Sequence, residues 1–130
     1  MLARVNEHRA SGAWCGDEWF PAVGPLRSDS RLQCAARRHS YDMAAHGYFS
    51  HDSLDGRSPF ERISATGYPG GAAENIYAGG SSAESVVASW MDSPGHCSNI
   101  MRGGYDEMGI GHAPANDGYA NYWTQTFGVR

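Results

Sequence analysis

The chain has 130 residues, a formal net charge of −4 and an ordinary apolar share of 41%. Its ten basic residues are scattered arginines, which excludes the basic surface of a nucleic-acid-binding protein, and no apolar run reaches the roughly 20 residues that span a bilayer. A chain of this length buries about two thirds of its unfolded surface, so one domain over residues 1–130 is expected.

The first half of the chain is predicted to be helical around one aromatic loop. Apolar residues at helical spacing predict a short helix over residues 2–10. Residues 13–26 break this pattern with tryptophans, glycines and prolines, and they predict a loop that packs by its aromatic side chains. A capping box formed by Ser30 and Gln33 then begins the longest predicted helix, which Gly47 ends.

Two histidines lie on or near the apolar stripe of that longest helix. We interpret His39 and His46 as core or helix-end histidines that are held by hydrogen bonds, rather than as metal ligands. They are therefore left out of the candidate site.

The middle of the chain contains a helix signal followed by a strand signal. Ser58, Pro59 and Glu61 stand in the order of a helix start, and they predict a helix that runs to about Thr66. After a glycine-rich link, residues 74–78 form a candidate strand that two glycines close.

The last third of the chain ends in two strands. A capping box at Ser81 and Glu84 predicts a helix with a wide apolar face, followed by a short turn that carries His96. Residues 108–112 and 119–127 are rich in β-formers and predict two strands joined by a hairpin loop. Because the strands do not alternate with helices in βαβ order, we predict the α+β class, with a small antiparallel sheet covered by helices on both faces.

Three short segments carry the residues with the most useful chemistry. FSHDSLDG contains His51, AENIYAGG contains Glu74, and SWMDSPGHCSNIM contains His96. We predict that the fold brings these segments together. Two imidazoles and one carboxylate with an open position suit Zn²⁺ or another divalent ion, and such a site would empty below about pH 6.5, because only neutral imidazole ligates a metal.

Other interpretations of the same residues stay open. Glu74 can instead anchor the loops by accepting hydrogen bonds from backbone amides or from a histidine. A serine hydrolase is a further interpretation, because four serines lie near the histidines in the sequence, although no GxSxG turn supports it. These serines are Ser50, Ser53, Ser93 and Ser98. Non-catalytic binding in an aromatic-walled pocket fits more of the sequence, although each aromatic alone is more readily explained as core; these are Tyr77, Trp90, Tyr105, Tyr122 and Trp123.

Taken in order, the segments resemble the CAP superfamily, which comprises the cysteine-rich secretory, antigen 5 and pathogenesis-related 1 proteins and is also called SCP-like. The bacterial branch is the most similar. The matching segments cover roughly residues 30–128 and are LQCAARRHSYDMA, FSHDSLDGRSPFERI, AENIYAG, VVASWMDSPGHCSNIM, MGIG and YWTQTFG. The resemblance implies a three-layer α-β-α sandwich, export from the cell, and a cleft lined by two histidines and two acids.

Three of these four cleft residues match positions in this sequence. The resemblance implies His51 and His96 as the histidines and Glu74 as one acid. The remaining acid of many eukaryotic members falls at Ser93 here, with Asp92 beside it. Further residues that we expect to line the cleft are Ser50, Asn75, Ser93, Asn99 and Tyr122.

The function that follows from this resemblance is a secreted, extracellular domain. We expect non-catalytic binding of a small or lipid-like ligand or a protein partner, with Zn²⁺ or another divalent cation as a possible cofactor, and a metal-dependent, peptidase-like hydrolase as the alternative. We also expect a monomer, with no nucleic-acid partner and no transmembrane segment. No signal peptide is visible in the first residues, so an export signal is expected to have been removed.

The three cysteines allow three single pairings. For a secreted chain a disulfide is expected, and Cys15 with Cys97 is the preferred pair, because it would tie the aromatic loop to the turn that carries His96. Such a bridge would contribute about 4–5 kcal/mol in the chain-entropy model. Cys34, in the middle of a helix, is expected to be a buried, inert thiol.

Overall fold

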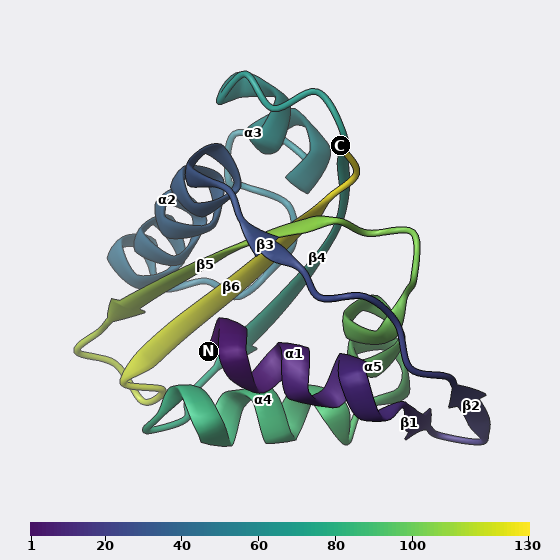
Figure 1. The fold of residues 1–130 in the computed structure, drawn as a ribbon. Helices are drawn as coiled ribbons and strands as arrows, with labels where there is room; N and C mark the ends of the chain where they lie inside the picture. The colour runs from purple at the N-terminus through teal and green to yellow at the C-terminus, as the bar shows by residue number, and fades with distance from the viewer.

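The computed structural model describes all 130 residues, and a four-stranded sheet lies at its centre (Figure 1). The helices are α1 (Leu2–Ser11), α2 (Ser30–His46), α3 (Pro59–Ala65), α4 (Ala83–Met91) and α5 (Pro94–Met101). The strands are β1 (Ala13–Cys15), β2 (Glu18–Phe20), β3 (Arg27–Ser28), β4 (Gly71–Ala78), β5 (Glu107–Pro114) and β6 (Asn121–Gly128).

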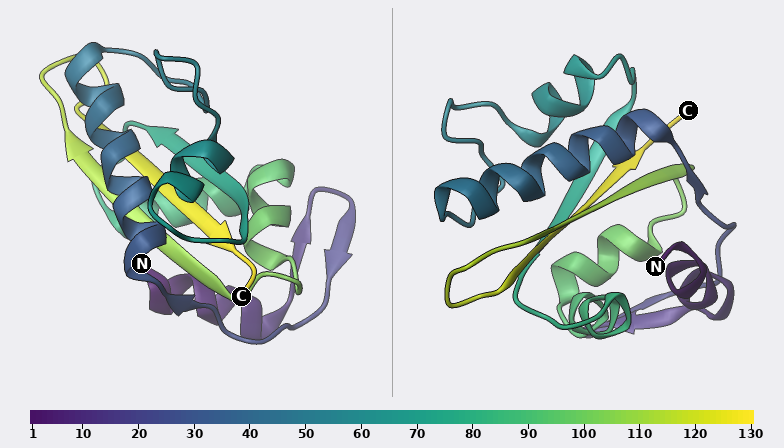
Figure 2. Two further views of the ribbon diagram at one scale, coloured as in Figure 1. Left: turned by 90° about the horizontal axis from the view of Figure 1, so that it is seen from above. Right: turned by 90° about the vertical axis from the view of Figure 1, so that its left-hand side faces the viewer.

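The sheet has the strand order β3-β5-β6-β4, so β4 is an edge strand. The pairs β4–β6 and β5–β6 are antiparallel, and the short pair β3–β5 is parallel. Helices α2 and α3 cover one face, while α1, α4 and α5 lie against the other (Figure 2). This arrangement confirms the predicted α+β class and the three-layer α-β-α sandwich.

Helix α2 lies unusually close to the sheet because β5 presents glycines beneath it. A Cβ atom added at Gly109 would lie 2.2 Å from the α2 backbone, and one added at Gly111 would lie 2.3 Å from it. The contact is partly polar, since the Ser40 and Thr124 hydroxyls are 2.7 Å apart and the Thr126 hydroxyl donates to the carbonyl of Leu32. This close approach fixes the helix that precedes the His51 loop.

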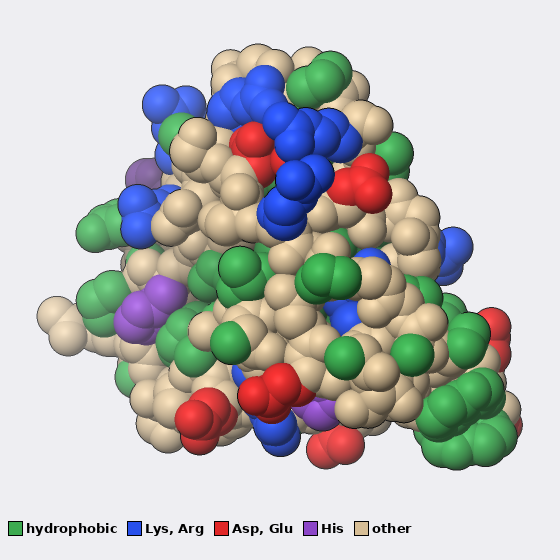
Figure 3. All heavy atoms as spheres, viewed as in Figure 1, with side chains coloured by type: hydrophobic (Ala, Val, Ile, Leu, Met, Phe, Trp, Pro, Cys, Tyr) green, Lys and Arg blue, Asp and Glu red, His purple; other side chains and the backbone are tan.

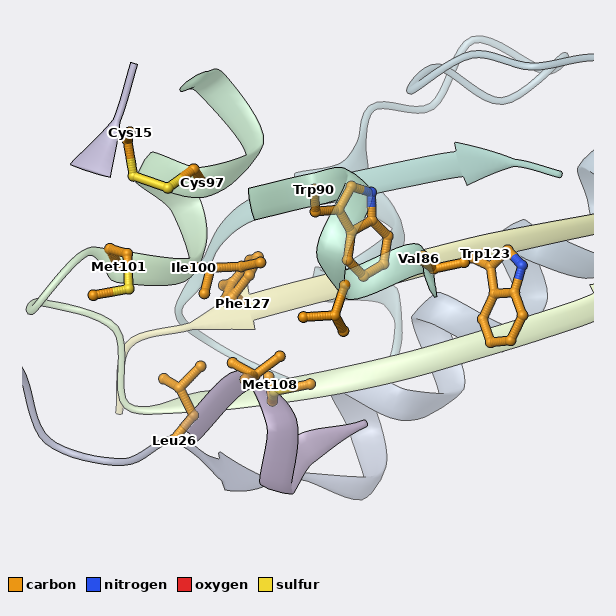
Figure 4. Packing of buried hydrophobic residues seen from close by; sticks show 12 residues of the cluster. Cys15, Leu26, Val86, Trp90, Cys97, Ile100, Met101, Met108, Trp123 and Phe127 are labelled. Atoms are coloured by element: carbon orange, nitrogen blue, oxygen red, sulfur yellow. A yellow bond between two sulfur atoms is a disulfide. The ribbon is translucent and has the colours of Figure 1, made fainter. Parts of the chain in front are cut away.

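The larger apolar core fills the space between the other face of the sheet and α1, α4 and α5 (Figure 4). Trp90 is fully buried, and its indole N–H donates to the carbonyl of Ile76 on β4. The core residues labelled in Figure 4 are Cys15, Leu26, Val86, Trp90, Cys97, Ile100, Met101, Met108, Trp123 and Phe127. The core therefore holds α4 and α5 against the strand that carries Glu74.

Two of the predicted helix starts are displaced by one residue. Asp29, and not Ser30, is the N-cap of α2, because its carboxylate accepts two backbone N–H bonds of the first turn. Ser82 forms a capping box with Ser85 at the start of α4. The capping box predicted for α3 is present, and α2 ends at Gly47 as predicted, with this glycine in the left-handed conformation.

Three other segments differ from the prediction. Residues 13–20 form the hairpin β1–β2 rather than an aromatic-packed loop, and the side chains of Trp14 and Trp19 are exposed. The turn predicted around His96 is the eight-residue helix α5, which a proline at its first position begins. Residues 27–28 add a short parallel strand at the edge that no sequence pattern indicated.

No helix combines the length and the apolar character that crossing a membrane requires.

Candidate functional site

The candidate site lies at the β4 edge of the sheet, where three segments meet. Glu74 projects from β4, His51 lies in the loop between α2 and α3, and His96 is the third residue of α5. The Nδ1 atom of His51 is 3.0 Å from Oε1 of Glu74. Burial lowers the pKa of His96, and the nearby His51 imidazole lowers it further. The structure therefore brings His51 and Glu74 into contact and places His96 close to His51.

A buried arginine that the sequence did not indicate supports this contact. The guanidinium of Arg62 donates to Oε2 of Glu74 at 2.6 Å, and both side chains are at least 95% buried. The same guanidinium donates to the carbonyls of His51 and Arg57 and to the hydroxyl of Ser53. Arg62 thus holds both the acid and the loop that carries the first histidine. The only sequence signal was its place beside Ile63 on the inward face of a short helix.

Each oxygen of the Glu74 carboxylate contacts one of these two neighbours. Oε2 accepts from Arg62, and Oε1 faces the imidazole of His51. No group of three or more His, Cys, Asp or Glu side chains is arranged to hold a metal ion. The structure thus does not show the two imidazoles and the carboxylate as a ligand set, and the metal site at His51, Glu74 and His96 stays a prediction.

The hydrogen bond to Glu74 fixes which nitrogen of His51 is free. A carboxylate accepts, so Nδ1 of His51 donates its proton, and Nε2 is the nitrogen that is left for another partner. The His51 side chain is 52% exposed, whereas that of Glu74 is 2% exposed. A buried acid that orients an exposed imidazole is the arrangement that prepares histidine for ligand contact or for proton transfer.

None of the four serines considered as a nucleophile hydrogen-bonds to an imidazole. The Ser53 hydroxyl accepts from Arg62, and the Ser98 hydroxyl donates to the carbonyl of Gly95. The Ser50 hydroxyl accepts from a backbone N–H, and the side chain of Ser93 makes no capping bond. The structure thus lacks the serine–histidine contact on which a triad depends.

Two of the predicted cleft residues belong to the framework of the site. The side chain of Asn75 is completely buried and donates both to the carbonyl of His96 and to Gln125. Asn99 donates to the Asn75 side-chain oxygen at 2.9 Å. These bonds tie α5, and therefore His96, to β4.

The other predicted cleft residues are divided between the site and the core. Ser50 is exposed beside His51, and Ser93 directly precedes α5. Tyr122 lies elsewhere: it pairs with Ala78 at the far end of β4, and its hydroxyl donates to Asp117. Its ring packs among apolar side chains, which explains its burial without any ligand.

The site is a surface feature rather than a deep pocket. The largest hollow in the molecule, about 440 Å³, lies between α1 and the start of α4. A second, of about 260 Å³, is bounded by α1, α2 and β5, and a third, of about 180 Å³, lies at the end of β5. Neither histidine nor Glu74 lines any of them.

The buried side chain of His39 holds the loop that carries His51. It is 1% exposed, and its Nε2 lies 2.7 Å from the carbonyl of Ser50, one residue before His51. Burial lowers its pKa, so the ring is neutral and donates to that carbonyl. This confirms the prediction of a hydrogen-bonded core histidine. His46, at the helix end, faces Asp42 at 3.4 Å.

The predicted disulfide is present, and it joins the N-terminal hairpin to the helix of the second histidine. Cys15 and Cys97 are bonded across a sequence separation of 82 residues (Figure 4). Because Cys97 directly follows His96, the bridge restrains the position of that imidazole. Cys34 is the free thiol, as predicted, but it is half-buried rather than buried, because it lies on the flank of α2.

Comparison with known proteins places the chain among bacterial relatives. The model of the cysteine-rich secretory protein family, CAP, matches residues 2–127. The chain is 36% identical over 104 residues to the uncharacterized protein YkwD of Bacillus subtilis (strain 168). The aligned region covers 79% of this chain and 39% of YkwD. The chain thus spans less than half of the length of this curated relative.

Solved structures of bacterial proteins share the fold. An extracellular protein with an SCP domain from Bacillus anthracis is 28% identical to this chain, with a TM-score of 0.73. The superposed region covers 83% of this chain and 35% of that protein's chain. An outer surface protein of Borrelia burgdorferi is 21% identical to this chain, with a TM-score of 0.78. The superposed region covers 99% of this chain and 89% of that protein's chain. At that identity the second comparison supports the fold alone.

Proposed function

The chain belongs to the cysteine-rich secretory protein (CAP) family, and from this premise we propose that it is a non-catalytic binding domain of an exported protein. An extracellular location is supported by the description of the similar structure from Bacillus anthracis as an extracellular protein. A disulfide is consistent with this location, because such bonds persist in oxidising compartments.

The observation that carries the proposal is the buried ion pair behind His51. A buried salt bridge adds little net stability over apolar residues of the same size, so its presence calls for another explanation. Here Glu74 and Arg62 lie beneath the surface and hold an exposed imidazole in one tautomer and one orientation. We take the ligand-contacting groups to be Nε2 of His51 and the imidazole of His96.

The shape of the site favours a polar ligand over a lipid tail. No hollow is lined by the two histidines, so an acyl chain would remain in water there. A divalent cation is a candidate ligand, with His51 and His96 as the residues that would hold it. Glu74 would then stay behind His51 as a hydrogen-bond acceptor, the usual partner of a ligating histidine.

Binding is favoured over hydrolysis because the machinery of a hydrolase is incomplete. No serine hydroxyl bonds to either imidazole, and no group of three metal-ligating side chains is arranged as a site. A general base alone contributes only part of the rate enhancement of such enzymes.

Zinc titration by calorimetry at pH 7.5 and pH 5.5 tests the proposal. We expect micromolar binding at pH 7.5 that is lost in His51→Ala and in His96→Ala and is weaker at pH 5.5, because protonated imidazole cannot ligate. The control is His112→Ala, since His112 is exposed and hydrogen-bonds to Asn121 on β6, away from the site. Binding that survives both site variants would contradict the assignment of the imidazoles, and no binding at either pH would exclude zinc as the ligand.

A further inference from the structure

The hairpin β1–β2 carries two exposed tryptophans on its outer face. Trp14 and Trp19 are 64% and 49% exposed, and they are directly opposite each other in the strand pairing. Their ring centroids are 5.5 Å apart. Figure 3 shows a large apolar patch at the lower right of the molecule, where the hairpin lies in Figure 1. The fold uses neither indole to fill its core.

The hairpin is a rigid platform rather than a loose loop. On its inner face, Cys15 is buried in the disulfide to α5, and Phe20 packs against the main core. Gly12 has a φ of 75°, and a Cβ added there would lie 2.8 Å from the Trp19 ring, so this glycine lets the indole lie against the backbone. The outward position of the tryptophans is therefore fixed by the fold.

Two acids without partners lie at the tip of the same hairpin. Asp17 and Glu18 are exposed, and neither takes part in any of the salt bridges of the chain. Indole faces attract cations, and Trp is the strongest of the aromatic side chains in this respect. Glu18 is paired with Cys15 and therefore lies on the opposite face from the indoles, which leaves Asp17, in the turn, as the acid that can act with them. The tryptophans and Asp17 thus favour the same kind of ligand, one with positive charge on a flat or apolar group.

We propose that Trp14 and Trp19, together with Asp17 in the turn between their strands, form a docking site for a short cationic segment of a partner protein. Arginine is the side chain that fits best, because its guanidinium stacks on an indole and pairs with a carboxylate at the same time. This site is separate from the histidine site and does not depend on the function proposed for it.

Other occupants fit the observations less well. A second copy of the chain would bring the two Asp17 side chains together across a two-fold axis, where like charges repel. An anionic membrane surface would repel the acidic tip, since such surfaces attract basic segments.

The test uses NMR of the four indole N–H groups with an acetylated, amidated hexa-arginine peptide as the probe. Trp90 and Trp123 are buried, so their signals serve as internal references. We expect shifts confined to Trp14 and Trp19, and at least fivefold weaker binding in Trp14→Ala. Tyr41→Ala is the aromatic control, because Tyr41 is 64% exposed on α2, and it should bind as the wild type does.

Asp17 provides a second test that leaves the packing of the hairpin intact. The variant Asp17→Asn should bind at least fivefold more weakly at 50 mM salt. Glu84→Gln changes the net charge equally on α4 and should change the affinity less than twofold. Equal weakening in both variants, or peptide shifts that spread over the protein, would overturn the proposal by showing general charge attraction.

Two further probes separate the alternative occupants. Neutral N-acetylglucosamine trimer and vesicles of phosphatidylcholine with phosphatidylglycerol are titrated against the same indole signals. Shifts of Trp14 and Trp19 with the trimer or the vesicles, but not with the peptide, would overturn the proposal in favour of a glycan or a membrane surface. Absence of any peptide binding at millimolar concentration would overturn it as well.

Discussion

Replacement of Arg62 by methionine is the sharpest test of how the site is supported. The change removes the guanidinium but retains an unbranched side chain in the buried space. It leaves the Glu74 carboxylate, which is 2% exposed, without its strongest partner. Three hydrogen-bond acceptors in the loop that carries His51 also lose their donor. Breaking a buried pair by removing one partner costs about 3–5 kcal/mol, because an uncompensated charge stays buried.

This loss is large relative to the stability of a domain of this size. Domains of this size unfold with a free energy of about 5–15 kcal/mol, so the variant should lose a fifth of its stability or more. At roughly 3–5 °C per kcal/mol, the Tm should fall by about 9–25 °C. Urea unfolding measures the free energy, and hydrogen exchange should show faster exchange in residues 51–57.

A double-mutant cycle separates the ion pair from the packing of the helix. Arg62→Met/Glu74→Met removes both charges, and it should recover most of the lost stability, since buried pairs are often replaced by apolar residues at little cost. Arg4→Met is the control, because Arg4 pairs with Glu7 on the exposed surface of α1. A loss below about 1 kcal/mol in Arg62→Met, or losses that simply add in the double variant, would refute the reasoning.

Three further predictions concern the rest of the chain. Reduction of Cys15–Cys97 should lower the unfolding free energy by about 4–5 kcal/mol in the chain-entropy model, measured by urea unfolding with and without reductant, while Cys34→Ser should leave this difference unchanged. Burial lowers the pKa of His39 below its ordinary 6.5, so below that pH the unfolded chain binds more protons than the folded chain. The free energy of unfolding should therefore fall as the pH is lowered from about 6.5 to about 5. His39→Gln, which retains a donor for the carbonyl of Ser50, should make this fall smaller in urea unfolding curves. Gly109→Ala should cost about 3 kcal/mol or more in the same assay, because its Cβ would meet the α2 backbone at 2.2 Å; an unchanged midpoint would show that α2 can move away.

Local signals in the sequence located the elements better than their ends. The helix α3 and the end of α2 at Gly47 were predicted because each carries a strong local signal, a capping box with proline at the first helical position for α3 and a glycine for α2. The starts of α2 and α4 were displaced because neighbouring Asp and Ser residues are all good caps. Asp29 and Ser82 were selected by the tertiary structure, which fixes where each helix can begin.

The exposed hairpin shows where composition misleads. Tryptophans in a loop predict burial, and half of that prediction is right, since the inner face of the hairpin packs against the core. A two-stranded hairpin has a second face, however, and side chains alternate between the two faces. Trp14 and Trp19 share the outer face, which the sequence could not indicate without the strand register.

Of the candidate site, the sequence indicated the three side chains with the most reactive groups but not what holds them. Arg62 remained hidden because its partners lie in a strand and a loop that only the fold brings to it. A lone arginine in a short helix has many surface explanations. Its role follows from burial, which no local pattern predicts for a charged residue.

The placement of the site on an edge strand explains how histidines from opposite layers can both be held by one short segment of β4. Adjacent residues of a strand point to opposite faces of the sheet, and Glu74 and Asn75 are adjacent on β4. Glu74 bonds to His51 and the α3 arginine on one face, while Asn75 bonds to the backbone of His96 on the other. In the middle of the sheet the two layers would be kept apart by the neighbouring strands. At the edge, two consecutive side chains of one strand can position one histidine from each layer, and this is the arrangement that the segment AENI provides.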